Sequence, residues 1–336
     1  MRLDLPPNTA ASAAIVVLAI VALAVFPFVG GKFALDLVTK IMIWAIFALS
    51  LELLVGRTGL VSFGHAAFFG IAAYVAAFLT PQSGPTSFWL MLPACVLAAG
   101  AYALAVGALS LRTRGVYFIM VTLAFAQMAY YVFHDTKLGG GSDGIYLYFR
   151  PTLTIGSVTL LDLDNARNYY WFVLAMLAAS FGFLGLLARS RFGHALAGIK
   201  ANEQRMRAVG FRTYGYKLAA FVIAAMLAGV AGLLYALKDG FVNPEIMSWH
   251  QSGAVLLMVI LGGIGSLRGA VLGAFAFALL QELYQSQAIL GPFAKHWQLS
   301  LGLTIVLFVA LLPQGLIGLG QLRGRLRRRA ALGASA

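Results

Sequence analysis

The chain has 336 residues, of which 61% are hydrophobic and 10% are charged, and its mean hydropathy is +0.88. A soluble domain carries about 25% charged residues and about half apolar residues, so this composition excludes an ordinary soluble enzyme and a disordered chain. The formal net charge of +13 does not indicate a nucleic-acid partner, because the basic residues are dispersed between long apolar segments. The composition predicts an all-α, polytopic transmembrane helix bundle.

Ten apolar segments are candidates for membrane-spanning helices. A helix needs about 20 apolar residues to cross ~30 Å of hydrocarbon, and the segments lack the alternation of barrel strands. The first segment is too long for the core of a signal peptide, so we expect it to be retained. The eighth is short and is either a full span or a re-entrant or broken helix. The ten segments cover residues 11–28, 35–54, 60–79, 88–110, 116–133, 170–187, 216–237, 251–264, 269–288 and 299–317.

The distribution of positive charge predicts the orientation of these helices. With ten spans and the amino terminus inside, 17 of the 24 Lys and Arg residues fall on the inner side and seven on the outer side. Cytoplasmic loops of membrane proteins are enriched in Lys and Arg. We therefore expect both termini to be cytoplasmic, with a transmembrane domain over residues 1–322 and an Arg-rich tail over residues 323–336.

The third segment, 60–79, carries small residues at helical spacing. Ser62, Ala66 and Gly70 are four residues apart, and such a stripe lets two helices approach closely. Gly64 and Gly70 are predicted packing residues. His65 lies beside the stripe and is either a packed polar residue or part of a translocation path, as is Ser62.

Two later segments also contain polar candidates for such a path: Gln127, which is the weaker one, and Glu282. Gln127 precedes a pair of tyrosines by one helical turn, and packing explains it better than a path role does. In the segment 269–288, Gly269 and Gly273 form a G-x-x-x-G packing motif. Glu282 extends a neighbouring alanine stripe, which predicts that it faces other helices. A charge at the membrane centre costs about 2.5–3.5 kcal/mol, so Glu282 is either a functional residue or a helix end that reaches the outer interface.

Two loops are longer than simple connections require. The outer loop 134–169 combines a glycine-rich turn with short β-prone runs at 145–149 and 153–161. The inner loop 188–215 fits a helix over 194–209, whose apolar stripe is Leu196, Ile199, Met206 and Val209. Glu203 and Arg207 are spaced for an i,i+4 ion pair, and Gly210 is placed to end the helix. An amphipathic helix between spans favours docking on a partner or on the membrane surface.

Sequence motifs for chemistry are missing. The chain has no P-loop, and its glycine run at 262–269 joins two membrane segments where a dinucleotide site needs a strand and a helix. The five histidines lack metal-ligand spacing, and the single cysteine, Cys95, permits no internal disulfide. We expect no enzymatic activity, no metal site and no cofactor bound by this chain.

The motifs, taken together, resemble those of LivM-type membrane permeases of binding-protein-dependent ABC importers for branched-chain amino acids. The resemblance covers nearly the whole chain after the first segment. It is specific because eight motifs occur in the order that the family shows. These are GLVSFGHAAF at 59–68, RGVYF at 114–118 with TLAFAQ at 122–127, GGSDG at 140–144, IKANE at 199–203, KLAAF at 217–221, AGVAG at 228–232, GGIGS at 262–266 and PQG at 313–315.

This resemblance implies a role for the inner loop. In such permeases the loop carries a coupling helix that docks on a cytoplasmic ATPase. The matching positions are Ala201, Asn202, Glu203, Ala208 and Gly210, to which we add Arg205. The run of Arg205, Met206 and Arg207 departs from the family's usual small or acidic residues. That departure leaves open which charged residue of the ATPase it would meet.

The implied machine has several further components. They are two cytoplasmic ATPase subunits that bind ATP and Mg²⁺, a second related permease chain, and a solute-binding protein outside the membrane. The implied location is the inner membrane of a bacterium, in contact with its lipids. Two alternatives remain: a permease of the same family for urea or short amides, and an ion-coupled secondary transporter that uses Glu282 as its coupling acid. A structural membrane protein would be a third class.

Overall fold

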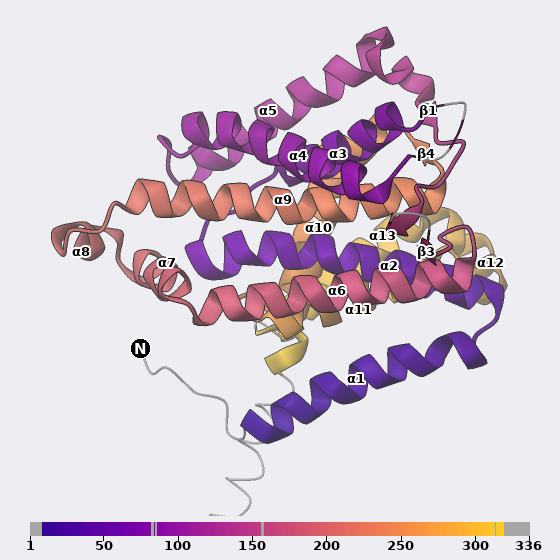
Figure 1. Cartoon of the computed structure of the whole chain (residues 1–336). Helices are drawn as coiled ribbons and strands as arrows, with labels where there is room; N and C mark the ends of the chain where they lie inside the picture. The colour runs from indigo at the N-terminus through magenta and orange to yellow at the C-terminus, as the bar shows by residue number, and fades with distance from the viewer. Residues whose placement is uncertain (1–8, 82–83, 85, 156–157, 313, 319–336) are drawn as a thin grey trace, which may run out of the picture.

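The computed structural model describes residues 9–318 except 82–83, 85, 156–157 and 313, so the Arg-rich tail 323–336 lies outside the described residues (Figure 1). The described chain is almost entirely helical. Its long helices are α1 (Thr9–Val29), α2 (Lys32–Glu52), α3 (His65–Leu79), α4 (Phe88–Ser110), α5 (Val116–Asp135), α6 (Ala166–Arg189), α9 (Thr213–Asp239), α10 (Trp249–Gly262), α11 (Leu267–Gln285) and α13 (Trp297–Leu311).

The helices occur in the order that the sequence predicts. Seven helical segments in the described part are long and apolar enough to cross a membrane, and three apolar helices are shorter. The shorter ones lie within α1, α3 and α10, so the predicted short segment 251–264 is indeed a short helix of 14 residues. The all-α membrane fold is confirmed. The number of complete spans stays a prediction. Length and composition allow seven segments to cross the membrane, and they do not decide whether the three shorter helices also cross it.

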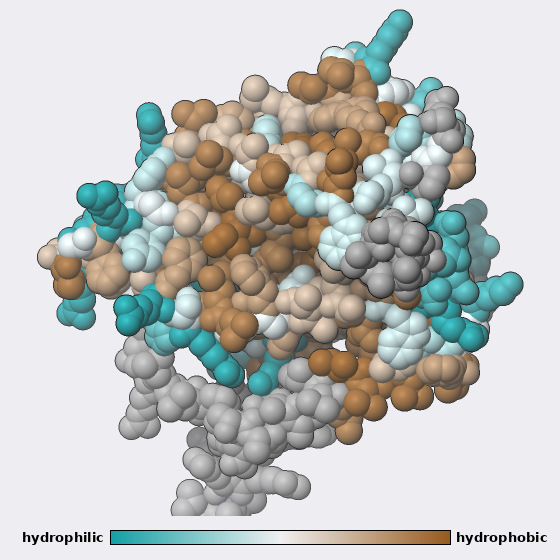
Figure 2. Space-filling model, viewed as in Figure 1, coloured by the Kyte–Doolittle hydropathy of each residue, from teal (hydrophilic) through white to brown (hydrophobic). Residues whose placement is uncertain are grey.

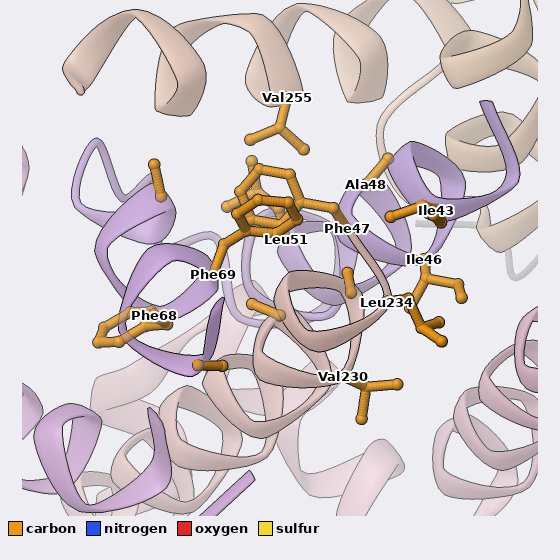
Figure 3. Close-up of a cluster of buried hydrophobic side chains, with 14 of the residues drawn as sticks. Ile43, Ile46, Phe47, Ala48, Leu51, Phe68, Phe69, Val230, Leu234 and Val255 are labelled. Carbon is orange, nitrogen blue, oxygen red and sulfur yellow. The ribbon is translucent and has the colours of Figure 1, made fainter. Parts of the chain in front are cut away.

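Helices α2 and α9 form the centre of the bundle (Figure 1). The most apolar part of the segment Lys32–Thr58 is 83% buried, whereas that of α5 is 22% buried. Helix α2 packs against α6, α9, α10 and α11, and α9 packs against α3 and α4. Figure 3 shows the aromatic and branched side chains of α2, α3, α9 and α10 meeting in this core, among them Phe47, Phe69, Leu234 and Val255. The peripheral helices leave their apolar outer faces uncovered.

The surface has an apolar middle and hydrophilic ends. In the view of Figure 2, brown residues cover the centre, and teal residues gather at the end with α7 (Arg191–Ala201) and α8 (Glu203–Ala208) and at the opposite end. This pattern matches the surroundings of a protein in a bilayer, which has hydrocarbon around its middle and water at both ends. The two ends are called here the loop end, which carries residues 188–215, and the far end.

Glycines allow the central helices to approach closely. A Cβ atom at Gly232 of α9 would lie 1.9 Å from the carbonyl oxygen of Phe69 in α3, and one at Gly273 of α11 would lie 1.9 Å from that of Met258 in α10. No side chain fits in these spaces. The contacts explain why the bundle needs small residues at these crossings, since packing drives helix association where the surroundings are apolar.

The prediction of a helix over 60–79 is wrong in its first turn, because α3 begins at His65. Helix α2 continues into one π-helical segment, Leu53–Thr58, which ends at Gly59 with a left-handed φ of 74°. Residues 59–64 then form an irregular turn in which the Ser62 hydroxyl accepts a hydrogen bond from the backbone N–H of Gly64 at 3.3 Å. Serine and glycine favour such turns over helix interiors. Ser62 therefore does not share a helical stripe with Ala66 and Gly70.

The loop 134–169 folds over the far end. Its strand β1 (Ile145–Tyr146) pairs antiparallel with β4 (Phe241–Val242), which follows α9, while β2 (Leu153–Ile155) and β3 (Val158–Leu161) form a hairpin. The β-prone runs thus contain strands, and β1 has a partner that is far away in the sequence. Five short segments complete this end and the last connection: Lys137–Gly139, Gly141–Asp143, Pro244–Met247, α12 (Gln287–Leu290) and Gly291–His296.

Candidate functional site

The inner loop contains two helices, so the single helix predicted over 194–209 is corrected to α7 and α8. They meet at Asn202, whose backbone is extended with φ −160° and ψ 100°. The Asn202 side-chain oxygen accepts a hydrogen bond from the backbone N–H of Arg205 at 2.9 Å and so caps α8. The predicted terminator is confirmed, because Gly210 follows α8 with a left-handed φ of 93°.

This break separates the predicted apolar stripe into two unlike halves. Leu196 and Ile199 of α7 are buried against the bundle, whereas Val209 after α8 is 70% exposed. Figure 1 shows α8 projecting beyond the ends of α6 and α9. Helix α7 is therefore the docked half of the loop, and α8 is the half that the rest of the chain leaves uncovered.

Glu203, at the start of α8, binds three side chains. Its Oε1 accepts hydrogen bonds from Arg207 at 2.6 Å and from the Thr213 hydroxyl at 3.0 Å, and its Oε2 accepts one from the Lys217 ammonium at 2.8 Å. The predicted i,i+4 pair with Arg207 is confirmed. Partial burial by itself raises the pKa of Glu203, but Lys217, Thr213 and Arg207 outweigh it and lower the pKa to about 2. The carboxylate therefore ties α8 to the first turns of α9.

Lys200, at the end of α7, binds the backbone of α2. Its ammonium donates to the carbonyl oxygens of Gly56 at 2.8 Å and Val55 at 3.5 Å. Both carbonyls belong to the π-helical end of α2, where a cation is also favoured by the negative end of the helix dipole. The loop is thus attached to α2 through Lys200 and to α9 through Glu203, and these are the two central helices.

Glu52 extends this connection to the next pair of helices. Its side chain is buried, and its Oε1 accepts a hydrogen bond from the backbone N–H of Gly265 at 2.7 Å. Gly265 lies in the turn between α10 and α11. A Cβ at Gly56 would lie 1.9 Å from that Oε1, so Gly56 leaves the space that the carboxylate occupies. Contacts run from α7 through the end of α2 to the α10–α11 turn.

Sequence reasoning did not single out Lys200, Lys217 or Glu52. Lys200 and Lys217 lie within the quoted family motifs, and Glu52 is an acid inside a predicted apolar span. An ionisable residue in such a segment is by default a functional candidate. That signal identifies Glu52 as important, but it does not identify a backbone N–H 213 positions away as its partner.

A cleft of about 620 Å³ opens between α2, α9, α10, α11 and α13. Its lining belongs to the half of these helices nearer the far end, and it includes the predicted path residue Glu282, with Lys40, Gln281 and several aromatic side chains. Ser62, His65 and Gln127 are not among its lining residues. The structure therefore does not bring the four predicted path residues into one cavity.

The other three path candidates have different surroundings. His65 is fully buried, its Nε2 lies 2.8 Å from the Ser50 hydroxyl, and its ring stacks on Phe47 with centroids 5.5 Å apart. Ser62 is buried in the turn before α3, and Gln127 is half-buried on α5. In the described ranges, no group of three or more His, Cys, Asp or Glu side chains is arranged to hold a metal ion.

The four glycines predicted to mediate packing all lie against other atoms. A Cβ at Gly64 would be 2.3 Å from the carbonyl oxygen of Thr122, and one at Gly70 would be 2.2 Å from the side chain of Met247. At Gly269 it would be 2.8 Å from the carbonyl oxygen of Gly263. Gly273 has the contact with α10 described above. Each position is close enough to a neighbour that a larger residue requires movement.

The long apolar helices, the apolar middle of the surface and the hydrophilic ends define a multi-pass α-helical membrane protein. A family model described as the permease component of branched-chain amino acid transport systems matches residues 33–312. The chain belongs to this family of transport permeases.

Two groups of curated relatives show where the similarity lies. The chain is 32% identical to the high-affinity branched-chain amino acid transport system permease protein LivM of Escherichia coli K12, over 96% of this chain and 78% of the relative. It is 31% identical to LivM of Salmonella typhimurium, over 93% and 76%. It is also 25% identical to the permease protein LivH of Salmonella typhimurium, over 82% and 91%. No solved structure matches the chain.

Proposed function

We propose that this chain is a permease subunit of an ABC importer that moves branched-chain amino acids across the inner membrane of a bacterium. Membership of the permease family carries the proposal, and similarity to LivM over nearly the whole chain favours this cargo. The chain crosses the membrane ten times, with both termini and the loop end in the cytoplasm. The excess of Lys and Arg on that side supports this orientation.

The proposed machine has partners on both sides of the membrane. Two cytoplasmic ATPase subunits hold ATP and Mg²⁺ and supply the energy. A second permease chain completes the path, which is supported by the similarity of this chain to both LivM and LivH. A solute-binding protein delivers the amino acid to the far end, where the loop 134–169 forms a surface.

The coupling segment of this proposal comprises Ala201, Asn202, Glu203, Arg205, Ala208 and Gly210. Its exposure supports a docking role, since α8 extends away from the bundle while its first residue is held by Lys217. A force on α8 would reach α9 through Glu203 and α2 through Lys200. Closure of the ATPase pair would thereby move the two central helices.

The uptake experiment separates this proposal from its alternatives. Cells with and without the chain are supplied with labelled leucine, urea or acetamide, and an uncoupler is added in parallel. The proposal expects loss of leucine uptake in the deleted strain and leucine uptake in the complete strain that follows ATP and resists the uncoupler. Lost urea or amide uptake with unchanged leucine uptake would change the cargo. Uptake that collapses with the ion gradient at constant ATP would favour a secondary transporter that uses Glu282.

The docking role of α8 is tested by charge reversal on its exposed face. The side chain of Arg205 is exposed, so Arg205→Glu leaves the contacts of Glu203 with α9 in place. We expect at least a fivefold loss of ATPase subunits that copurify with the permease and a parallel loss of uptake. Arg112→Glu is the matched control, because Arg112 is an exposed arginine at the loop end that lies outside α8. Equal copurification of the two variants would contradict the docking role.

A further inference from the structure

The cleft at the far end contains two charged side chains of opposite sign. Lys40 of α2 and Glu282 of α11 both line it, and α2 packs directly on α11. Neither charged group takes part in a hydrogen bond or ion pair within the described part of the chain. The cleft volume of about 620 Å³ lies within the range of roughly 300–1,000 Å³ that small-molecule sites occupy.

Lys40 is exposed and Glu282 is half-buried, so both charged groups are accessible from the open cleft. Charged residues within membrane helices commonly line paths or pair with opposite charges. One cation and one anion on the same cleft create a site where a ligand of either charge would satisfy only one of them. A ligand that carries both charges satisfies both, and such a ligand is a zwitterion.

The remaining lining describes the rest of that ligand. Beside the two charges, the cleft presents aliphatic side chains, including Ile41 of α2, Leu257 of α10 and Leu301 of α13, together with aromatic rings that include Trp44 and Trp297. Apolar walls favour an aliphatic group through the removal of its surface from water. The amide groups of Gln281 and Gln285 add hydrogen-bonding capacity near Glu282.

We propose that this cleft is the entry site of the translocation path and that it binds a zwitterionic amino acid with an aliphatic side chain. Lys40 binds the carboxylate, Glu282 binds the ammonium group, and the aliphatic wall accepts the side chain. The inference rests on the proposed function and deepens it by naming the residues of the site. Uncharged urea or acetamide has no charge to pair with Lys40 or Glu282, so the cleft favours a zwitterion over both.

Uptake per ATP hydrolysed tests the two charges in the complete transporter. The assembled complex is placed in proteoliposomes with the binding protein outside and ATP on the ATPase side. We expect Lys40→Gln and Glu282→Gln each to lower leucine uptake per ATP hydrolysed at least tenfold while ATP hydrolysis stays within twofold of wild type. Lys32→Gln removes an exposed charge from the same end of α2 at a position that does not line the cleft, and it should retain the wild-type ratio.

A labelling experiment tests binding itself on a chain with both charges intact. Cys95 is fully buried, so Ala278→Cys on the cleft wall introduces an accessible thiol. We expect millimolar leucine to slow labelling of this thiol at least threefold in the complex without its binding protein. Isopentylamine, which lacks the carboxylate, and 4-methylpentanoate, which lacks the ammonium group, should slow it less than 1.5-fold.

The outcomes separate this inference from the proposed function. Wild-type complex that does not import leucine with ATP would overturn the proposed function and the inference with it. Wild-type import combined with unchanged ratios in Lys40→Gln and Glu282→Gln would overturn the inference alone. So would the absence of leucine protection at Ala278→Cys, which is the result expected if lipid or the second permease fills the cleft. Equal protection by the two single-charge analogues would overturn the zwitterion assignment.

Discussion

Two charged side chains connect the inner loop to the helix bundle, a third connects α2 to the α10–α11 turn, and each uses a different kind of partner. Lys200 donates to backbone carbonyls, Glu203 accepts from side chains, and Glu52 accepts from a backbone N–H. A hydrogen bond to a charged group contributes about 1.5–3 kcal/mol, and a buried group left without its partner costs a similar amount. These contacts therefore hold the loop in one position relative to α2 and α9.

The Glu203 contacts predict how loop stability depends on pH. The pKa of this carboxyl is lowered from 4.5 to about 2, so its stabilising effect is complete above pH 4.5 and is lost as the pH falls toward 2. We expect the free energy of unfolding of the wild type to exceed that of Glu203→Gln by about 2 kcal/mol near neutral pH. This difference should shrink as the carboxylate is protonated. Thermal unfolding of both proteins in detergent at several pH values measures it. A difference that is constant from neutral to acidic pH would contradict the assignment.

The fit between Gly56 and Glu52 predicts the effect of one methyl group. In Gly56→Ala the new Cβ would lie 1.9 Å from the Glu52 Oε1, so the carboxylate must move and release the N–H of Gly265. We expect a loss of about 1–3 kcal/mol in the free energy of unfolding. Gly185→Ala is the control, because no atom lies within 4 Å of its Cβ position. Equal unfolding midpoints for the two variants would show that Glu52 does not hold the turn.

At the scale of elements, the contact between α10 and α11 depends on backbone approach. Met258 and Gly262 of α10 face Gly273 of α11 without an intervening side chain. The same end of this pair is held to α2 through Gly265 and Glu52. Helices α10, α11 and α2 are therefore connected at the loop end, and other parts of the same three helices line the cleft at the far end.

Widening this crossing should destabilise the unit. The Cβ of Gly273→Ala would lie 1.9 Å from the backbone oxygen of Met258, and a backbone atom cannot turn aside as a flexible side chain does. We expect a loss of about 1–3 kcal/mol or more and a lower unfolding midpoint in detergent. Gly182→Ala on α6, whose Cβ position has no atom within 4 Å, should match wild type. A wild-type midpoint for Gly273→Ala would mean that the two helices are not packed this closely.

At the scale of the whole molecule, the hydropathy of the surface and the charge asymmetry define an axis across the membrane. The loop end carries α7 and α8, and the far end carries the paired strands and the cleft (Figures 1 and 2). Under the two proposals above, this separation puts the docking surface for the ATPase and the site for the solute at opposite ends of the same central helices.

The proposed orientation is tested by labelling from each side. Gln204 in α8 and Ser142 in the outer loop are exposed at opposite ends, and Cys95 is buried. With a membrane-impermeant maleimide, we expect Ser142→Cys to react in intact spheroplasts and Gln204→Cys to react only in inverted vesicles. Reaction of both variants from one side would contradict the proposed orientation, because it would require an even number of spans between the two positions where one is predicted.

Local patterns in the sequence were sufficient for some features and insufficient for others. The helix order, the i,i+4 pair of Glu203 with Arg207 and the terminator Gly210 follow from spacing within one segment. The break at Asn202 and the late start of α3 at His65 were missed. In both places a side chain that caps or turns the backbone prevailed over a continuous apolar or small-residue pattern.

The amino-acid sequence alone established a multi-span helical protein of the permease family, because long apolar segments and ordered motifs are local properties of the chain. Only the tertiary structure brought Lys200 to the carbonyls of α2, Glu52 to the turn at Gly265, and Lys40 and Glu282 to one cleft. These residues are separated by more than one hundred positions, and hydropathy and spacing carry no information about which helices become neighbours. The packing of small residues at the helix crossings makes that choice, and it thereby decides where charges meet.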